Sequence, residues 1–381
     1  MITIPFNKPF LTGNETKYIE QAVMSGKISG NGIFTHKCQQ FFEQKYGFGK
    51  CLITSSCTDA LEMAAILCNL TPNDEVIIPS YTFVSTALAF AREGARIVFA
   101  DSSLENPNID PDSIESIINQ NTKVLVIVHY GGVACDMDRI MEIVKRHQLI
   151  LIEDCAHAFD SYYGARPLGS FGQMATFSFH ETKNIISGEG GMLAVNSPTL
   201  FHRAEVIWEK GTNRSDFFSG KTDKYEWIDT GSSFLPSEIT TAFLFGQLEN
   251  YQRIQARRIA IWMEYYGHLH GPLGNIGIST GNIPGKCSCN GHLFYLLCRS
   301  YDERRQLTRH LANCGILAVS HYLALHKSPY YTAKYPKQGN TADLPVSCMY
   351  EKQLLRLPLY YELETEQVSH ICNMILEFYN L

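Results

Sequence analysis

Three short stretches of the chain carry residue types that could do chemistry together. FSFHETKNIISGEGG (177–191) sets Lys183 between an apolar strand and a glycine-rich turn, where burial would lower the pKa of the amine and leave it nucleophilic toward aldehydes. LILIEDCAHA (149–158) ends an apolar strand on Asp154, and a buried carboxylate requires a cationic partner. SSCTDAL (55–61) joins a strand to a helix through small residues, and a helix N-terminus attracts phosphate.

Each stretch alone has an ordinary structural explanation: a surface lysine, a cap at a strand end and a capped helix start. The set, in this order along the chain, is what pyridoxal 5'-phosphate (PLP) requires. The acid would pair with the protonated pyridine nitrogen and make the ring an electron sink, the lysine would hold the aldehyde, and the small-residue turn would hold the phosphate. The sequence therefore favours an enzyme that uses PLP.

These residues stand at the ends of elements that alternate between strand and helix. The alternation runs through 51–70, 74–103 and 123–158 and continues to about residue 240. Continuous apolar strands between helices predict an α/β fold with a mostly parallel sheet covered on both faces. Ligands of such sheets bind at the carboxyl ends of the strands, where the three stretches lie.

The rest of the chain predicts a second, smaller unit. Residues 236–269 are expected to form a long, nearly unbroken helix, followed by an α+β pattern with a strand at 316–322 and a last helix from about 364. A chain of 381 residues is also long for one domain. We therefore expect a large domain over 1–240, and a connecting helix with a small C-terminal domain over 241–381.

Composition argues against several classes of protein. The net charge is -6 and no block of like charge stands out, so no nucleic-acid or membrane surface is expected. No apolar run approaches the roughly 20 residues that cross a bilayer, and the N-terminus lacks the pattern of a signal peptide. The twelve cysteines are scattered, and the close pair Cys287 and Cys289 lacks a second pair at zinc-ligand spacing. We expect a cytoplasmic protein without a bound metal.

Nearly the whole chain resembles the DegT/DnrJ/EryC1/StrS group of sugar aminotransferases, which are fold-type-I PLP enzymes. The resemblance is carried by SSCTDALEMA, DEVIIPSYTFVST, IEDCAHA, GEGG and HYLALH, and above all by FSFHETKN, VHYGGVACDMD and EKGTNRS. The last three are similar to the branch that aminates dTDP-4-keto-6-deoxy-D-glucose. The resemblance implies PLP as cofactor and a homodimer whose active sites lie at the subunit interface.

The resemblance also implies roles for individual residues. Lys183 matches the Schiff-base lysine and proton shuttle, Asp154 the partner of the pyridine nitrogen, and His157 the residue that faces the 3-hydroxyl. The other cofactor contacts would be Phe83, stacked on the ring, with Cys57, Thr58 and Ser178 at the phosphate. Ser233 in GSSFLPSE stands where much of the family sends an asparagine from the other subunit to the phosphate, and a serine reaches less far.

Substrate-side residues follow from the same resemblance. From the small domain, His321, His326 and Tyr330 would contact the sugar. The basic candidates for the nucleotide diphosphate are Lys27, Lys210 and Arg214. Each of these could equally be a surface side chain.

The expected reaction moves an amino group from L-glutamate to dTDP-4-keto-6-deoxy-D-glucose. It yields 2-oxoglutarate and dTDP-4-amino-4,6-dideoxy-D-glucose, an activated sugar for surface polysaccharide such as O-antigen. The alternative product has the galactose configuration at C4, because the orientation of the hexose decides the face of protonation. NIISGEGG is one residue shorter than expected for the galactose-forming branch, which favours the glucose product.

Three rival functions make different demands on the sequence. A sugar dehydratase on this scaffold would carry histidine in place of Lys183. A non-catalytic relative would be expected to have lost Lys183 or Asp154, and both are present. A nicotinamide enzyme would need GxGxxG after an early strand, and GEGG comes late and opens no helix.

Overall fold

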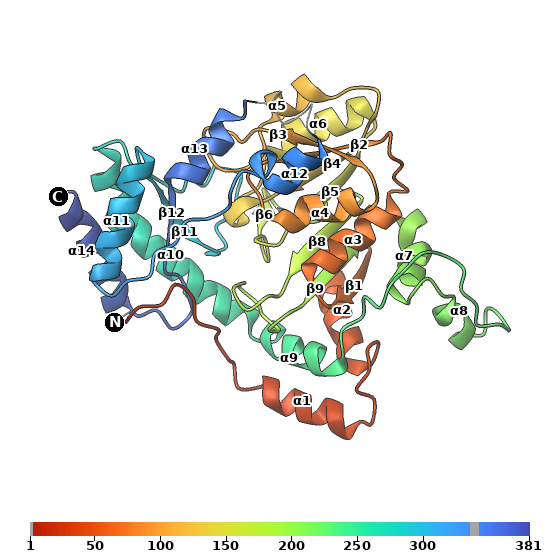
Figure 1. Cartoon of the computed structure of the whole chain (residues 1–381). Helices are drawn as coiled ribbons and strands as arrows, with labels where there is room; N and C mark the ends of the chain where they lie inside the picture. The colour runs from red at the N-terminus through yellow and green to blue at the C-terminus, as the bar shows by residue number, and fades with distance from the viewer. Residues whose placement is uncertain (1–2, 336–342) are drawn as a thin grey trace.

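A seven-stranded sheet forms the centre of the large domain (Figure 1). The computed structural model describes residues 3–335 and 343–381. The strand order is β1-β9-β8-β5-β4-β2-β3, with parallel pairing from β8 to β3, and β9 runs antiparallel to both β1 and β8. The strands are β1 (Lys50–Thr54), β2 (Glu75–Pro79), β3 (Arg96–Ala100), β4 (Thr122–Val128), β5 (Ile150–Asp154), β8 (Met174–Ser178) and β9 (Gly191–Val195). The predicted α/β fold with a mostly parallel sheet is confirmed.

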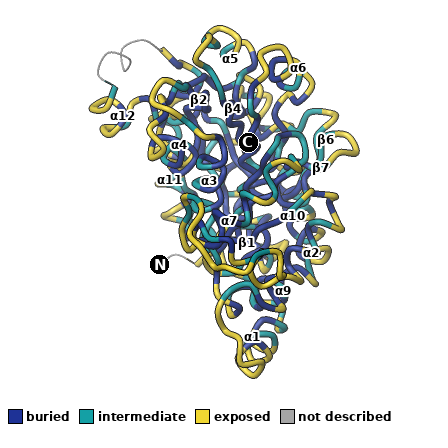
Figure 2. The backbone as a smooth tube through the Cα atoms, turned by 90° about the vertical axis from the view of Figure 1, so that its right-hand side faces the viewer, coloured by how far each residue is buried: buried dark blue, intermediate teal, exposed yellow. Residues whose placement is uncertain are grey.

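Helices cover both faces of this sheet, which is why its strands are almost continuously buried (Figure 2). Successive strand residues alternate between two cores: Ile53 of β1 packs in one and Leu52 in the other. The first core takes side chains from α2 (Ile33–Tyr46), α5 (Pro111–Ile117) and α6 (Met137–His147). The second takes side chains from α3 (Cys57–Leu67), α4 (Val84–Arg92) and α7 (Phe201–Trp208).

The long, nearly unbroken helix predicted over 236–269 is interrupted once. The structure has α9 (Glu238–Leu248) and α10 (Tyr251–Gly274), with Asn250 between them in a non-helical conformation at φ -110° and ψ 9°. The Asn250 side-chain amide donates to the Gly246 carbonyl at 3.1 Å, and such local side-chain bonds compete with the helix.

The packing of α9 and α10 shows where the core of the large domain gives way to that of the small domain. Helix α9 packs against α1 (Glu15–Met24) and α2, both parts of the large domain. Along α10, Ile254 belongs to the large-domain core, whereas Ile261 and the residues after it belong to the small-domain core. The division drawn at residue 240 therefore falls inside α9, and the packing places the change within α10.

The small domain has the predicted α+β character, with an antiparallel sheet of three strands. These are β10 (Ser279–Thr280), β11 (Phe294–Leu297) and β12 (Leu354–Leu357), packed with α10, α11 (Tyr301–Asn313) and α14 (Thr365–Phe378). The strand predicted at 316–322 is absent. Ile316 and Val319 form only isolated bridges, because Ile316 pairs with Ile4 of the N-terminal segment and Val319 with Arg356 of β12.

Shorter elements complete the described chain. They are β6 (Tyr162–Tyr163), β7 (Arg166–Pro167), α8 (Arg214–Phe218), α12 (Pro329–Lys334), α13 (Pro345–Gln353) and the 3-10 turns Tyr130–Gly132, Pro198–Leu200 and Leu325–Lys327. None of the helices in the described residues combines the length and the apolar character needed to cross a membrane.

Candidate active site

A cleft of about 980 Å³ lies where the carboxyl ends of the strands meet the small domain. The large domain contributes residues that follow β1, β2, β5 and β8, as expected for a doubly wound sheet. The small domain contributes Ser320, His321, Tyr322 and Arg356. Of the residues predicted for the site, the cleft is lined by Cys57, Thr58, Phe83, Asp154, His157, Ser178, Lys183 and His321.

The start of α3 presents backbone donors to this cleft. Ser56 caps the helix, and its hydroxyl accepts from the Asp59 N–H at 3.0 Å. The N–H groups of Cys57 and Thr58 are thus the first of the helix, and a helix N-terminus with such groups binds phosphate. The Thr58 hydroxyl also lies 2.8 Å from the Ser85 hydroxyl, which fixes it at the cleft wall.

Asp154 ends β5 as a carboxylate that is only 4% exposed. One oxygen accepts from the Thr86 hydroxyl at 2.8 Å and the other from the Ala156 N–H at 3.1 Å. Burial raises the pKa of this carboxyl, because the charged form loses its hydration. The described residues place no ion-pair partner on it, so a cation bound in the cleft would stabilise it.

Lys183 lies in the loop between β8 and β9 and is half-buried. Its backbone N–H donates to the His180 carbonyl at 2.9 Å, and Gly188 at φ +80° turns the chain back toward β9. Burial lowers the pKa of the amine to about 8, and the charge of Arg356 acts in the same direction. A neutral amine therefore becomes available close to physiological pH, as nucleophilic and proton-transfer chemistry requires.

His157 follows Asp154 on the same loop and is buried against other rings. Its Nδ1 accepts from the Gly131 N–H at 3.2 Å, so Nε2 carries the proton and faces the Tyr322 hydroxyl at 3.2 Å. The ring stacks on His292 with centroids 4.3 Å apart. Burial, together with the charge of Lys183, holds the pKa of His157 well below its usual value, so the imidazole is neutral.

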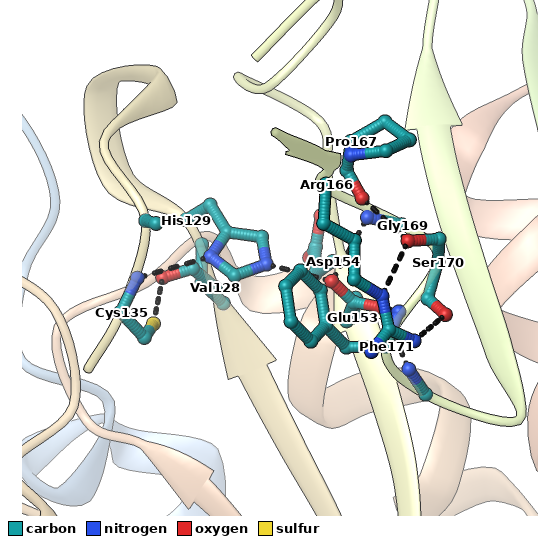
Figure 3. A network of polar contacts seen from close by, with 12 residues as sticks. Val128, His129, Cys135, Glu153, Asp154, Arg166, Pro167, Gly169, Ser170 and Phe171 are labelled. Carbon is teal, nitrogen blue, oxygen red and sulfur yellow. Dashed lines mark hydrogen bonds and ion pairs between the residues drawn. The ribbon is translucent and has the colours of Figure 1, made fainter. Parts of the chain in front are cut away.

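Glu153, the residue before Asp154, has a structural role (Figure 3). Glu153 points away from the cleft and accepts the N–H groups of Gly169, Phe171 and Gly172 at 2.7–2.8 Å. His129 lies 3.1 Å from the same carboxylate. Because successive strand side chains alternate in direction, one acid of the Glu-Asp pair braces the 167–172 loop and the other reaches the cleft.

The sequence profile of the DegT/DnrJ/EryC1/StrS aminotransferase family matches residues 9–376. The chain belongs to this family. The GDP-perosamine synthase of Escherichia coli O157:H7 is 31% identical over 381 residues, which cover 99% of each protein. The spore coat polysaccharide biosynthesis protein SpsC of Bacillus subtilis is 30% identical over 98% of this chain and 96% of its own. The crystal structure of the aminotransferase TlmJ from Streptoalloteichus hindustanus matches with a TM-score of 0.90 at 25% identity over 99% of each chain.

This DegT-family chain is a PLP-dependent sugar aminotransferase. The residues present fit the cofactor: a free helix N-terminus for its phosphate, a buried carboxylate lacking a cation for its ring nitrogen, and an amine of lowered pKa for its aldehyde. When bound, PLP supplies an electron sink that allows a proton to leave the carbon that carries the amino group. Phe83 remains 56% exposed at the cleft, where its ring is open to a planar ligand.

Two of the three small-domain residues predicted to contact the sugar lie elsewhere. His326 is buried away from the cleft, with Nδ1 2.6 Å from the Ser80 hydroxyl and Nε2 3.8 Å from the Cys348 sulfur. Tyr330 is 60% exposed on α12 and does not line the cleft. Only His321 reaches it, held by the Tyr130 hydroxyl at 2.6 Å. The HYLALH stretch forms a 3-10 turn at 325–327, which directs His326 into the protein.

The remaining predicted residues, Ser233, Lys27, Lys210 and Arg214, also lie outside the cleft of their own chain. They gather around Glu209: Ser233 pairs with it through the backbone, and the Arg214 guanidinium is 3.7 Å from its carboxylate. Lys210 follows it directly in the chain. The Lys27 ammonium donates to the Asn31 carbonyl, and the Asn31 side-chain amide donates to the Glu209 carboxylate.

Among the cleft residues that sequence reasoning missed are Arg356, His292 and Tyr322. Arg356 interrupts the apolar run LLRLPL (354–359), and a charge inside a predicted strand was a signal that could have been used. His292 and Tyr322 carry no comparable signal, because their positions depend on how the small domain packs against the large one.

Proposed function

We propose that this enzyme transfers the amino group of L-glutamate to the C4 ketone of dTDP-4-keto-6-deoxy-D-glucose, giving 2-oxoglutarate and dTDP-4-amino-4,6-dideoxy-D-glucose. The observation that carries amino transfer is the placement of Lys183 and Asp154 on one cleft with the N-terminus of α3. The choice of sugar is supported by FSFHETKN, VHYGGVACDMD and EKGTNRS, which resemble the branch that aminates this compound.

Lys183 has the chemistry of the proton shuttle. With a pKa of about 8, part of the amine is neutral near pH 7 and can accept the proton from Cα of glutamate. The resulting ammonium can later deliver a proton to C4 of the sugar. Asp154 would pair with the ring nitrogen of the cofactor, and the Nε2–H of His157 is a hydrogen-bond donor at the same cleft.

The alternative product has the galactose configuration at C4. Lys183 delivers its proton from one side of the cleft in either case, so the orientation of the hexose decides the product. The loop from Lys183 to Gly191 borders the space for the sugar, and its short length in this chain favours the glucose series.

Proton NMR of the product tests the assignment. The enzyme is supplied with glutamate and dTDP-4-keto-6-deoxy-D-glucose, and the H3–H4 coupling is measured. A large coupling shows an equatorial amine and supports the glucose product, whereas a small coupling shows the galactose product. A GDP-linked 4-keto-6-deoxyhexose is run in parallel, because one relative is named for a GDP-sugar. Amination of that compound alone would overturn the dTDP assignment.

A homodimer is part of the proposal. The basic residues around Glu209 can serve a substrate only if they reach the cleft of a second subunit, because they lie outside their own. The same segment exposes large apolar side chains, with Trp227 82% and Phe218 72% exposed. Such exposure on one projecting segment is typical of a protein interface.

Mixed dimers test this arrangement. Lys183→Ala and Arg214→Ala subunits are each purified, then unfolded together, refolded and assayed. If Arg214 serves the neighbouring cleft, a mixed dimer contains one site with both residues and regains up to about a quarter of wild-type activity by random assortment. Refolded single variants are the controls. Recovery that stays at their level, or a monomer by light scattering, would contradict the shared site.

The product would feed the synthesis of a surface polysaccharide such as O-antigen. The name of the relative SpsC links that protein to a coat polysaccharide, which supports this assignment. We place the enzyme in the cytoplasm. All twelve cysteines are free thiols, as expected in a reducing compartment.

A further inference from the structure

Asn184, the residue after Lys183, has a side chain that is buried and fully hydrogen-bonded. Its amide donates to the Gln255 side-chain oxygen and to the Asn290 carbonyl, both at 2.8 Å. Its oxygen lies 2.8 Å from Nδ1 of His292. Because that oxygen can only accept, His292 carries its proton on Nδ1. These bonds fix the backbone at Asn184, and with it the point from which the Lys183 side chain leaves the loop.

The face of the His292 ring contacts His157. His292 lines the cleft, and the two rings stack with centroids 4.3 Å apart and an angle of 26° between their planes. Burial lowers the pKa of both rings well below the usual value, so both are neutral and pack face to face without charge repulsion. One side chain therefore touches the loop of Lys183 through its Nδ1–H and touches His157 through its face.

The segment 290–292, which leads into β11, is also bonded to the loop that follows β5. The Asn290 side-chain amide donates to the His157 carbonyl at 2.7 Å and to the Phe159 carbonyl at 3.1 Å. The Asn290 side-chain oxygen accepts from the His292 N–H at 3.0 Å. The segment therefore joins the loop after β5 to the loop after β8, although the two loops are separate in the sequence.

A buried arginine holds the same segment from the side of α10. Nε of Arg258 donates to the Gly291 carbonyl at 3.1 Å, and Nη2 donates to the His292 carbonyl at 2.8 Å. Burying a guanidinium is costly unless its donors are used, and hydrogen bonds from a charged donor are stronger than neutral ones. Arg258 therefore fixes the position of His292 relative to α10.

We propose that His292 is a positioning residue that holds Lys183 and His157 in one fixed arrangement. The two side chains follow different strands, and amino transfer needs the amine and the His157 N–H to be placed against the same small molecule. A contact that both share at His292 sets the two positions together. This inference rests on the proposed roles of Lys183 and His157 and adds the residue that orients them.

The first test reads the Lys183 amine without cofactor or substrate. The pH midpoint of Lys183 acylation is measured in the apoenzyme, where burial lowers the pKa of the amine to about 8. His292→Phe keeps a ring that can stack on His157 and removes the Nδ1–H that binds Asn184. We expect the midpoint to rise by about one pH unit, because a released loop lets water reach the amine and stabilise its charged form.

Two control variants separate positioning from a loss of stability. His270→Phe on α10 removes the 2.9 Å contact between a ring Nδ1 and the Thr280 hydroxyl, outside the cleft. Ile371→Val removes a methyl group from the small-domain core. Neither should move the lysine midpoint. An unchanged midpoint in H292F, or an equal rise in Ile371→Val at the same loss of melting temperature, would overturn the proposal.

A second variant reverses the two contacts. In His292→Asn the side-chain amide reaches as far as Nδ1 and can still donate to Asn184, but no ring is left to stack on His157. The Lys183 midpoint should stay near pH 8. Nitrogen NMR of the labelled apoenzyme should show that His157 no longer keeps a single Nε2–H tautomer, because its ring can turn away from the Gly131 N–H. A rise of the midpoint as large as in H292F would contradict the role of the Nδ1–H bond, and an unchanged tautomer would contradict the role of the stack.

The enzyme loaded with PLP distinguishes this inference from the proposed function. Mixed with L-glutamate alone, H292F should lose visible cofactor absorbance about 10- to 100-fold more slowly than wild type, as expected for a misplaced reacting group. This half-reaction needs no sugar, so a wrong sugar assignment leaves its result unchanged. A Lys183→Ala enzyme that still takes the amino group would overturn the proposed function, whereas an H292F enzyme at the full rate would overturn only the positioning role.

Discussion

Gly191 and Cys57 approach each other so closely that a Cβ on Gly191 would lie 2.4 Å from the Cys57 amide nitrogen. Gly191 is the first residue of β9 and Cys57 is the first residue of α3. The start of the strand therefore packs directly against the helix N-terminus that faces the cleft. The atoms met by that Cβ belong to the backbone and cannot rotate away. A glycine at this position therefore sets where the first N–H groups of α3 stand.

Gly191→Ala should weaken both the fold and the binding of PLP. We expect the free energy of unfolding to fall by about 1–3 kcal/mol, as for other overpacked sites. Titration of the apoenzyme with PLP should show a higher dissociation constant, because the helix start must shift. Gly267→Ala on α10 is the matched control, since its Cβ meets open space and alanine favours helix by up to about 1 kcal/mol. A G191A enzyme with wild-type stability and PLP affinity would contradict the account.

Asp154→Asn should stabilise the apoenzyme and damage the holoenzyme. Burial raises the pKa of this carboxyl, so the charged form destabilises the folded state as pH rises above the ordinary value of 3.8. An amide removes that cost at pH 7 and still accepts from the Ala156 N–H. The cofactor ring loses its anionic partner, so kcat should fall at least about 10- to 100-fold. Urea unfolding and steady-state assays measure the two effects, with Thr86→Val as the control for the lost hydrogen bond.

The pKa of Lys183 can be read in the apoenzyme. An amine-acylating reagent should modify Lys183 with a midpoint near pH 8, because only the neutral amine reacts and burial lowers its pKa to about 8. Exposed Lys352 serves as the internal control for the reactivity of the reagent. The lowered pKa of Lys183 also makes the free energy of unfolding depend on pH. Between pH 10.5 and 8 the unfolded chain holds a proton on this amine that the folded chain lacks, so stability falls as pH falls through that window. Lys183→Met should remove this dependence.

The cofactor side of the cleft could be predicted because it depends on local patterns. Lys183 and Asp154 follow apolar strands, and parallel strands bring their carboxyl ends to one edge whatever the rest of the chain does. The α/β alternation needed only hydrophobic runs and turns. Residue types at strand ends therefore located this half of the site, and the resemblance supplied His157 and Phe83.

The substrate side depends on packing between distant segments, which local patterns do not report. Arg356 and Tyr322 reach the cleft because the small-domain sheet and the irregular 316–322 segment pack against the large domain. His326 shares a hexapeptide with His321, yet a 3-10 turn and the Ser80 hydroxyl direct it into the protein. The break between α9 and α10 rests on a side-chain bond from Asn250 that competes with the helix.

The buried histidines of the cleft predict acid sensitivity. Burial lowers the pKa of His157, His292 and His321 well below the ordinary 6.5. Below pH 6.5 the unfolded chain therefore binds protons that the folded chain refuses, and stability must fall as pH falls, by up to about 1.4 kcal/mol per pH unit for each histidine. Urea unfolding of the apoenzyme at pH 7.0, 6.0 and 5.5 should show this slope.

A substitution at a cleft histidine, compared with one at an exposed histidine, tests whether the cleft histidines cause this pH dependence of stability. His321→Gln should reduce the slope by about one proton, because a neutral amide replaces a ring that resists protonation. His370→Gln, an exposed change on α14, is the control substitution. If H321Q and wild type lose stability in parallel between pH 7.0 and 5.5, His321 accepts its proton as readily in the folded cleft as in water. The Tyr130 hydroxyl, 2.6 Å from Nδ1, would then be donating to a ring that can ionise at Nε2.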